Sequence, residues 1–305
     1  MSQQLFTPEA DEPSGGLGYP LVLTEPVRNP VKPIMGVLLG VLAFVILVPV
    51  VSQLVLRLTW LLRGRPPFEQ YQADALAYEL PEGLLASHLG LAMLIVISVL
   101  LARYLHARGW RWLVSVQPGV RWRYLLACLL VALVVLNAVL WLSFAFVEMP
   151  AFQAPQANWA VFLAIILVTS PIQAAAEELF FRGYVLQAVG TAFQQAWVGI
   201  VGSALLFALF HGVQNPALFV NRFAFGLVVG FLVWRTGGLE AAIGAHVVNN
   251  VFAFGYGIFT GGVAATKATS AIGWDKAFFD VLGFALFALA AWWVGRRMRV
   301  ATTTP

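Results

Sequence analysis

Residues 34–56 read IMGVLLGVLAFVILVPVVSQLVL, and this stretch decides the class of fold. It contains no charged residue. A helix of roughly 20 apolar residues is enough to cross a bilayer core about 30 Å thick. The stretch is too long, and begins too late in the chain, for a cleaved secretory signal. It therefore predicts a membrane-spanning helix.

Further uncharged stretches of similar length follow along the chain, separated by polar or charged breaks. A composition of 60% apolar and 10% charged residues, with a mean hydropathy of +0.83, is not typical of a soluble protein. We predict an all-α membrane protein, a bundle of about eight transmembrane helices. The expected helices cover residues 34–56, 84–102, 125–147, 159–186, 196–211, 217–234, 241–259 and 277–294.

Little sequence lies outside this predicted transmembrane domain, which extends over residues 34–299. Residues 1–33 combine six prolines with Gly, Ser and Glu, which is typical of a disordered tail. Residues 64–83 are acidic and predict a short interfacial helix, and residues 300–305 form a C-terminal tail. The single Cys128 excludes an intrachain disulfide and a cysteine-rich metal site.

The arginines of the short loops indicate an orientation. They gather after the second predicted helix and after the last one, and positively charged loops stay in the cytoplasm. We therefore predict that both termini are cytoplasmic, which an even number of helices permits. Arg57, Arg63 and Arg65, after the first helix, are the exception. The net charge of +4 is explained by these loops, so it does not indicate nucleic-acid binding.

The predicted helix 159–186 carries charges where charges are costly. Glu177, Glu178 and Arg182 stand within otherwise apolar sequence, and buried charges are unfavourable unless they are paired or hydrated. Glu178 and Arg182 are four residues apart on one helical face, so they can form an ion pair. Glu177 is rotated by about 100° from Glu178. It is therefore available for another role.

Polar residues of two later helices reach a similar depth. His211 closes the fifth predicted helix, and His246 and Asn250 share a face of the seventh. With a rise of about 1.5 Å per residue, measured from the expected cytoplasmic ends, these side chains and Glu177 can lie in one layer.

This set of side chains fits two kinds of hydrolytic site. Glu177, His211 and His246 could hold a divalent metal such as zinc, with an open position for water. Without a metal, Glu177 would take a proton from water, one histidine would orient it, and Asn250 would donate to the developing oxyanion. Either scheme predicts hydrolysis of an amide bond.

Structural roles are the alternative for the same residues. A lone membrane histidine is more often a hydrogen bonder between helices, and the Glu178–Arg182 pair could be structural. A transporter also buries charges at mid-depth, but it usually has inverted repeats and discontinuous helices, neither of which is found in this sequence. A non-catalytic immunity or scaffold protein could keep the fold while its site decays.

Three motifs in this order resemble the signature of the CPBP family, which includes type II CAAX prenyl endopeptidases, Abi proteins and bacteriocin-processing proteins. The resemblance covers residues 158–260 approximately. The motifs are Glu177-Glu178-x-x-x-Arg182, Phe207-x-x-x-His211 and His246-x-x-x-Asn250.

The resemblance implies a helical membrane metalloprotease whose catalytic residues open toward the cytoplasm. Glu177 would be the general base, and His211 would complete the water or metal site. His246 and Asn250 would stabilise the tetrahedral intermediate or help to hold the metal. The ion pair of the first motif would be supporting.

The substrate is expected to be a membrane-associated peptide or protein, met in the lipid bilayer. Arg outnumbers Lys by fifteen to three, which indicates a GC-rich prokaryotic genome, where prenylated CAAX proteins are not expected. We therefore predict a multi-pass protein of a prokaryotic cell membrane, and no nucleic-acid partner.

Overall fold

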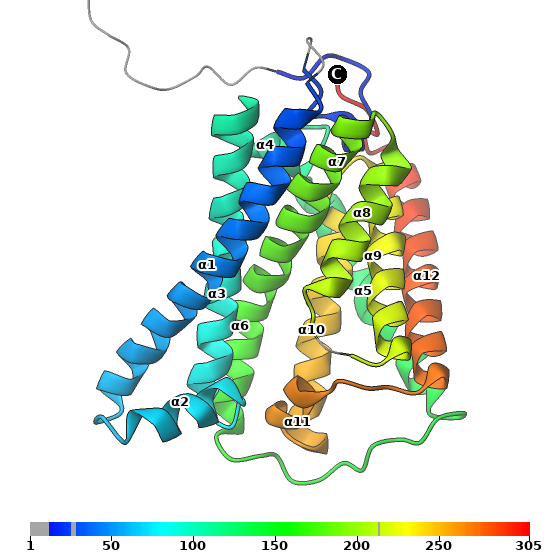
Figure 1. Ribbon diagram of the computed structural model, residues 1–305. Coiled ribbons are helices and arrows are strands. Elements are labelled where there is room, and N and C mark those ends of the chain that lie inside the picture. The colour runs from blue at the N-terminus through cyan, green and yellow to red at the C-terminus, as the bar shows by residue number, and fades with distance from the viewer. Residues whose placement is uncertain (1–11, 26–28, 213) are drawn as a thin grey trace, which may run out of the picture.

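The computed structural model describes residues 12–25, 29–212 and 214–305, which form a tall bundle of helices (Figure 1). In this part of the chain, seven helices are long and apolar enough to cross a membrane. This confirms the predicted all-α membrane bundle. The seven are α1 (Val31–Leu62), α3 with η2 (Pro81–Leu105), α5 (Trp122–Ser143), α6 with η3 and α7 (Trp159–Phe193), α9 (Pro216–Thr236), α10 (Glu240–Thr260) and α12 (Trp274–Arg297).

The fifth predicted span differs from the expectation. Residues 196–211 were expected to cross the membrane, but α8 (Ala196–Leu209) has only 14 residues. At about 1.5 Å per residue it rises roughly 21 Å, which is less than the bilayer core. The chain leaves the helix through His211 and Gly212, whose φ of 78° is left-handed and suits glycine. His211 therefore lies on a loop within the bundle.

Short helices cover the two ends of the bundle. α2 (Phe68–Leu76) lies within the segment 64–83, where a short helix was expected, and its Tyr71 is buried. α11 (Val263–Ala268) lies at the same end as α2 in Figure 1. α4 (Trp110–Val114) lies at the opposite end. We call the end with α2 and α11 the α11 end.

Both ends of the described chain meet at the end opposite α11, which we call the terminal end (Figure 1). The backbone N–H of Gly16 donates to the carbonyl of Thr304 at 3.0 Å. Tyr19, in the short helix η1 (Tyr19–Leu21), is fully buried, and its hydroxyl donates to the carbonyl of Leu113. The disordered tail predicted for residues 1–33 therefore does not extend over 12–25, because apolar side chains there add to the core. Residues 1–11 and 26–28 lie outside the described residues.

The helix that carries the first motif runs through the centre of the bundle. α6 (Trp159–Glu178) packs between α3 and α10, and α10 in turn packs on α5. A side chain on Gly244 would approach Cys128 of α5 to 3.1 Å, so the absence of one lets α10 and α5 lie close together. Directly after Glu178, the chain continues as the π-helical segment η3 (Leu179–Val185), all of it buried. Such π-helical turns are frequent at functional sites.

Candidate functional site

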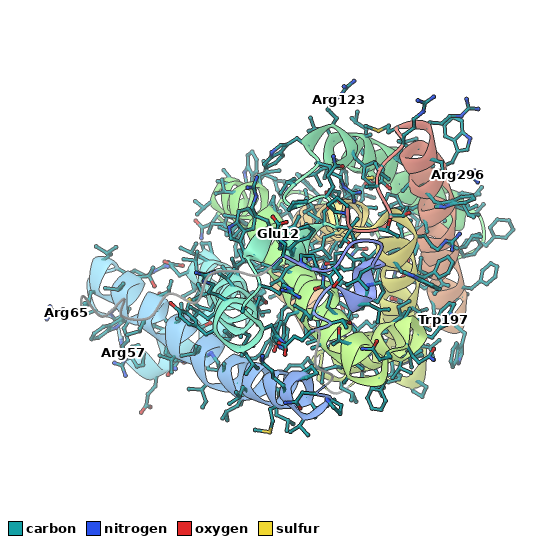
Figure 2. The ribbon with its side chains drawn as sticks, turned by 90° about the horizontal axis from the view of Figure 1, so that it is seen from above. Glu12, Arg57, Arg65, Arg123, Trp197 and Arg296 are labelled. Carbon is teal, nitrogen blue, oxygen red and sulfur yellow. The ribbon has the colours of Figure 1, made fainter. Side chains whose placement is uncertain are left out.

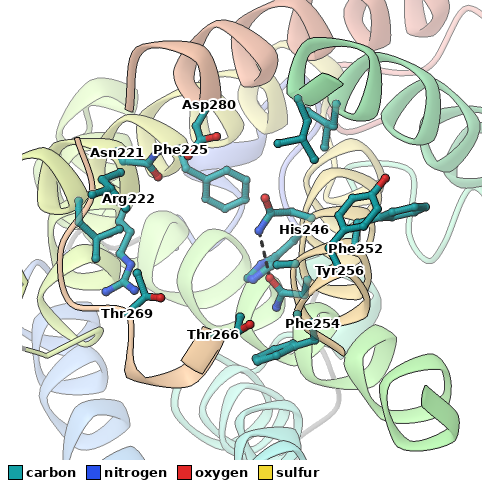
Figure 3. Close-up of a pocket in the computed structure, with 18 of the residues that line it drawn as sticks. Asn221, Arg222, Phe225, His246, Phe252, Phe254, Tyr256, Thr266, Thr269 and Asp280 are labelled. Atoms are coloured by element: carbon teal, nitrogen blue, oxygen red, sulfur yellow. Dashed lines mark hydrogen bonds between the residues drawn. The ribbon is translucent and has the colours of Figure 1, made fainter. Parts of the chain in front are cut away.

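One cavity of about 1040 Å³ brings together four of the six predicted site residues. Glu177, His211, His246 and Asn250 all line it. Figure 3 shows His246 at the cavity wall formed by α10. The depths in the membrane that were estimated from the sequence therefore grouped four side chains that line one cavity. The other two predicted residues belong to a layer behind the cavity wall.

Glu177 is held at the cavity by two neighbours. Its side chain is buried, with 7% exposed. Oε1 accepts a hydrogen bond of 2.7 Å from the Nε2 of Gln173, one turn earlier on α6. Oε2 lies 3.6 Å from the Nε2 of His246 on α10. The carboxylate is therefore oriented by a neutral amide and placed beside an imidazole.

Behind this carboxylate, Glu178, Arg182 and His246 form a buried polar cluster. Nη1 of Arg182 donates to Oε1 of Glu178 at 3.0 Å, and both side chains are fully buried. This confirms the predicted ion pair. Nδ1 of His246 lies 2.7 Å from the same Oε1. Because a carboxylate only accepts, Nδ1 carries the proton and the opposite nitrogen, Nε2, is directed toward Glu177.

Aromatic rings surround the guanidinium group of Arg182. Its carbon Cζ lies 4.0 Å from the ring centroid of Phe207 on α8 and 5.4 Å from that of Phe225 on α9. A cation held over aromatic faces is stabilised by the ring quadrupoles. Arg182 thereby links η3 to α8 and α9, two of the helices that line the cavity.

Gln173 was not predicted from the sequence, although it connects two of the predicted residues. Its Nε2 donates to Glu177, and its Oε1 accepts a bond of 2.9 Å from the Nδ2 of Asn250. The sequence did contain a signal, which is the spacing. Gln173 lies four residues before Glu177, in a run without charged residues. A single uncharged glutamine does not interrupt an apolar stretch, so hydropathy alone does not single it out.

His211 reaches the cavity from the loop after α8. Its Nδ1 lies 2.7 Å from the carbonyl of Phe207, which can only accept, so Nδ1 donates. Nη1 of Arg222 donates to the backbone carbonyl of His211 at 3.3 Å. Within the described chain, His211 makes no hydrogen bond or ion pair with Glu177 or His246. The structure thus places His211 in the same cavity, but it pairs described atoms of His211 with the backbone and not with the carboxylate.

The predicted metal ligands do not form a ready-made metal site. Among the described residues, no group of three or more His, Cys, Asp and Glu side chains is placed to hold a metal ion. Glu177 and His246 supply two donors close together, while Nδ1 of His246 is engaged by Glu178. The donor set therefore does not fit a three-ligand zinc site in this arrangement, and we derive no reaction step through a metal.

The lining of the cavity extends to the α11 end. Its lining there includes Glu148 from the loop before α6, Thr266 and Lys267 from α11, and Lys276 from the start of α12. Figure 3 shows Thr266, Thr269 and Asp280 around this part. The cavity thus opens away from the termini. The two expectations of cytoplasmic termini and of a site open to the cytoplasm therefore exclude one another.

Comparisons with known proteins add to this geometry. Residues 157–252 match the family model described as type II CAAX prenyl endopeptidase Rce1-like, and this match includes all six predicted site residues. The chain is 30% identical over 163 residues to the uncharacterized protein YyaK of Bacillus subtilis (strain 168). That match covers 50% of this chain and 54% of YyaK, about half the length of each. No solved structure matches the chain.

Proposed function

We propose that this protein is an intramembrane endopeptidase, because residues 157–252 match the family model described as type II CAAX prenyl endopeptidase Rce1-like. Its substrate would be a peptide bond of a membrane-associated protein or peptide. One observation carries the proposal: the Glu177 carboxylate faces a large cavity, is oriented by Gln173 and lies 3.6 Å from the imidazole of His246. A buried, oriented carboxylate beside an imidazole is suited to activate water.

In the proposed reaction, Glu177 removes a proton from a water molecule as its oxygen attacks the substrate carbonyl carbon. The Nε2 side of His246 orients that water, and its Nδ1 stays bonded to Glu178. Asn250 donates to the oxygen on which negative charge develops, as an amide of an oxyanion hole does. The C–N bond then breaks, and the proton held by Glu177 passes to the leaving amine.

His211 and the buried ion pair have separate parts in this proposal. Because Nδ1 of His211 donates to the backbone, Nε2 is the ring nitrogen that is available to substrate or water. Glu178 and Arg182 do not line the cavity, so they position His246 and the surrounding helices. The supporting observation is the bond of 2.7 Å between Glu178 and His246.

The proposal is tested by peptide hydrolysis. The full chain, purified in detergent and reconstituted in liposomes, is incubated with a fluorogenic peptide library. We expect cleavage by the wild-type protein. A folded, monodisperse protein that cleaves no peptide would contradict the proposal and would favour a scaffold or transport role.

The divalent metal expected from the sequence stays a prediction with its own test. A metal-assisted reaction would lose activity in a chelator and regain it when zinc is added back. A reaction that needs only Glu177 and its neighbours would proceed unchanged in the chelator.

Gln173 yields a further prediction. In Gln173→Leu the Glu177 carboxylate loses a hydrogen bond to a charged group, worth about 1.5–3 kcal/mol. We expect kcat to fall by roughly 10- to 100-fold, because the base is no longer oriented, and KM to change little. The measurement is steady-state hydrolysis of a cleaved library peptide.

Gln187→Leu is the matched control for this variant. Gln187 is a buried glutamine like Gln173, but it lies on α7 (Leu186–Phe193), outside the cavity, and donates to the carbonyl of Trp112 at 3.1 Å. It should lose stability without a comparable loss of kcat. Equal losses of kcat in both variants would show that Gln173 is merely structural.

A further inference from the structure

A further polar side chain, His88 of α3, reaches the cavity away from the Glu177 site. Seen from above, Arg57, Arg123 and Arg296 lie at the periphery of the bundle (Figure 2). His88 instead lies inside, with 3% of its surface exposed, and it lines the same cavity as Glu177. Buried polar atoms in proteins nearly always have hydrogen-bond partners. Both nitrogens of this ring therefore need to be accounted for.

One ring nitrogen of His88 has its partner within the protein. Nδ1 lies 2.7 Å from the hydroxyl oxygen of Thr169 on α6. That hydroxyl donates its single hydrogen to the carbonyl of Ile165, also at 2.7 Å, so its oxygen accepts from His88. Nδ1 therefore carries the proton, and in the neutral ring Nε2 is an acceptor. The bond joins α3 to α6 without using Nε2.

The second ring nitrogen, Nε2, is accessible to a ligand. Within the described chain it has no hydrogen-bond partner, and unlike Nη2 of Arg182 it is not completely enclosed. Its ring meets that of Phe254 on α10 edge to face, with 6.0 Å between the centroids, and Figure 3 shows Phe254 at the cavity wall. An acceptor among apolar groups is unfavourable without a donor. Nε2 is therefore suited to an N–H or O–H group that enters the cavity.

The spacing along α6 gives the distance between this acceptor and the Glu177 carboxylate. Thr169, which holds His88, lies eight residues before Glu177, or about 12 Å at a rise of 1.5 Å per residue. An extended peptide advances about 3.3 Å per residue, so about four of its residues cover this distance. A helical peptide of the same four residues would cover only about 6 Å. The spacing thus favours an extended ligand.

We propose that Nε2 of His88 accepts a hydrogen bond from a backbone N–H of the substrate, about four residues from the cleaved bond. The substrate is then an extended peptide segment that lies along α6 between His88 and Glu177. Leu91 and Phe254 line the cavity with His88, so apolar side chains of the substrate fit this part. The position of the cleaved bond rests on the proposed function, whereas the contact at His88 does not.

Backbone N-methylation tests this contact, because it removes one N–H donor of the peptide at a time. The peptide is a cleaved library peptide or, if none is cleaved, the library peptide that Glu177→Gln binds most tightly by fluorescence anisotropy. Each of its backbone nitrogens is methylated in turn. Hydrolysis is followed in the wild-type protein and binding in Glu177→Gln, each with and without His88→Leu. His88→Phe, which keeps a ring against Phe254, is a second variant if His88→Leu does not fold.

His106→Leu is the matched control for these variants. His106 is also a buried histidine bonded to a hydroxyl group, that of Tyr184 at 3.1 Å, and it directly follows η2, the continuation of α3. It does not belong to the cavity lining. A loss that comes only from a broken bond between helices should therefore appear in this variant as well.

We expect methylation at one position, about four residues from the cleaved bond, to raise KM by about 3- to 10-fold and to leave kcat within about twofold. His88→Leu should raise KM for the unmodified peptide by a similar factor and should remove the effect of methylation at that position. His106→Leu should do neither. In the binding arm, the dissociation constant should follow the same pattern.

The outcomes separate this inference from the proposed function. If no position stands out, or if the same position still stands out in His88→Leu, the inference is overturned, while cleavage would still support an endopeptidase. Absence of any peptide binding would overturn it too. Binding that depends on His88 and on one N–H, without cleavage, would support the contact and contradict the proposed function.

Discussion

Glu177→Gln is expected to reduce peptide hydrolysis by about 10²- to 10⁴-fold, the range that a positioned general base contributes. The amide has nearly the same shape as the carboxylate, and its oxygen can still accept the bond from Gln173. The variant should therefore fold like the wild-type protein while it lacks a group able to take the proton from water. The measurement is kcat/KM on a cleaved library peptide, together with the thermal unfolding midpoint in detergent.

Glu148→Gln is the control for this prediction. Glu148 lines the same cavity at its outer part and is exposed, so the same chemical change is made without touching the inner site. Its activity should stay close to that of the wild-type protein. Full activity in Glu177→Gln would remove Glu177 as the base, and an equal loss in both variants would point to the overall charge of the cavity.

The spanning helices could be predicted because each apolar run satisfies a simple requirement of length and composition. The outcome for α8 shows the limit of that reasoning. Residues 196–211 are as apolar as the other runs, but where a helix ends depends on its last residues and on the loop that follows. Ser203, at the middle of α8, even donates to the carbonyl of Phe181 at 2.7 Å, a contact that hydropathy does not predict.

The candidate site was predictable to the extent that helix geometry determined it. The spacing of four residues predicted the Glu178–Arg182 pair, and the depth estimate predicted that four side chains share one layer. The rotation of the helices about their axes was not available from the sequence. For that reason neither the link of Gln173 to Asn250 nor the position of His246 between two carboxylates could be predicted.

The direction in which the cavity opens was also beyond the sequence alone. The arginine count indicates which end of the bundle is cytoplasmic, but it does not say at which end the helices diverge. In the structure, Arg121 and Glu240, which are far apart in the sequence, are paired at the terminal end, and the cavity lining lies toward the other end. The cavity lining reaches α11 and the loop before α6, at the end opposite the termini, so the implied cytoplasmic opening and the expected cytoplasmic termini cannot both hold.

Arg182→Met is expected to destabilise the protein by about 3–5 kcal/mol, because it leaves Glu178 as a buried charge without its cation. Both side chains are fully buried, so water cannot replace the lost partner. His246 alone would remain bonded to the carboxylate. The change should appear as a lower unfolding midpoint in detergent and as a lower yield.

Two comparisons make this prediction specific. Arg63→Met breaks an ion pair at the α11 end whose arginine side chain is 39% exposed, and such pairs contribute about 0–1 kcal/mol. The double variant Glu178→Gln/Arg182→Met removes both buried charges, so most of the lost stability should return. If the double variant were as unstable as Arg182→Met, the stacking of the guanidinium group on Phe207 and Phe225 would be the main contribution of Arg182. Recovery of stability would instead show that its main contribution is to neutralise the carboxylate that holds His246.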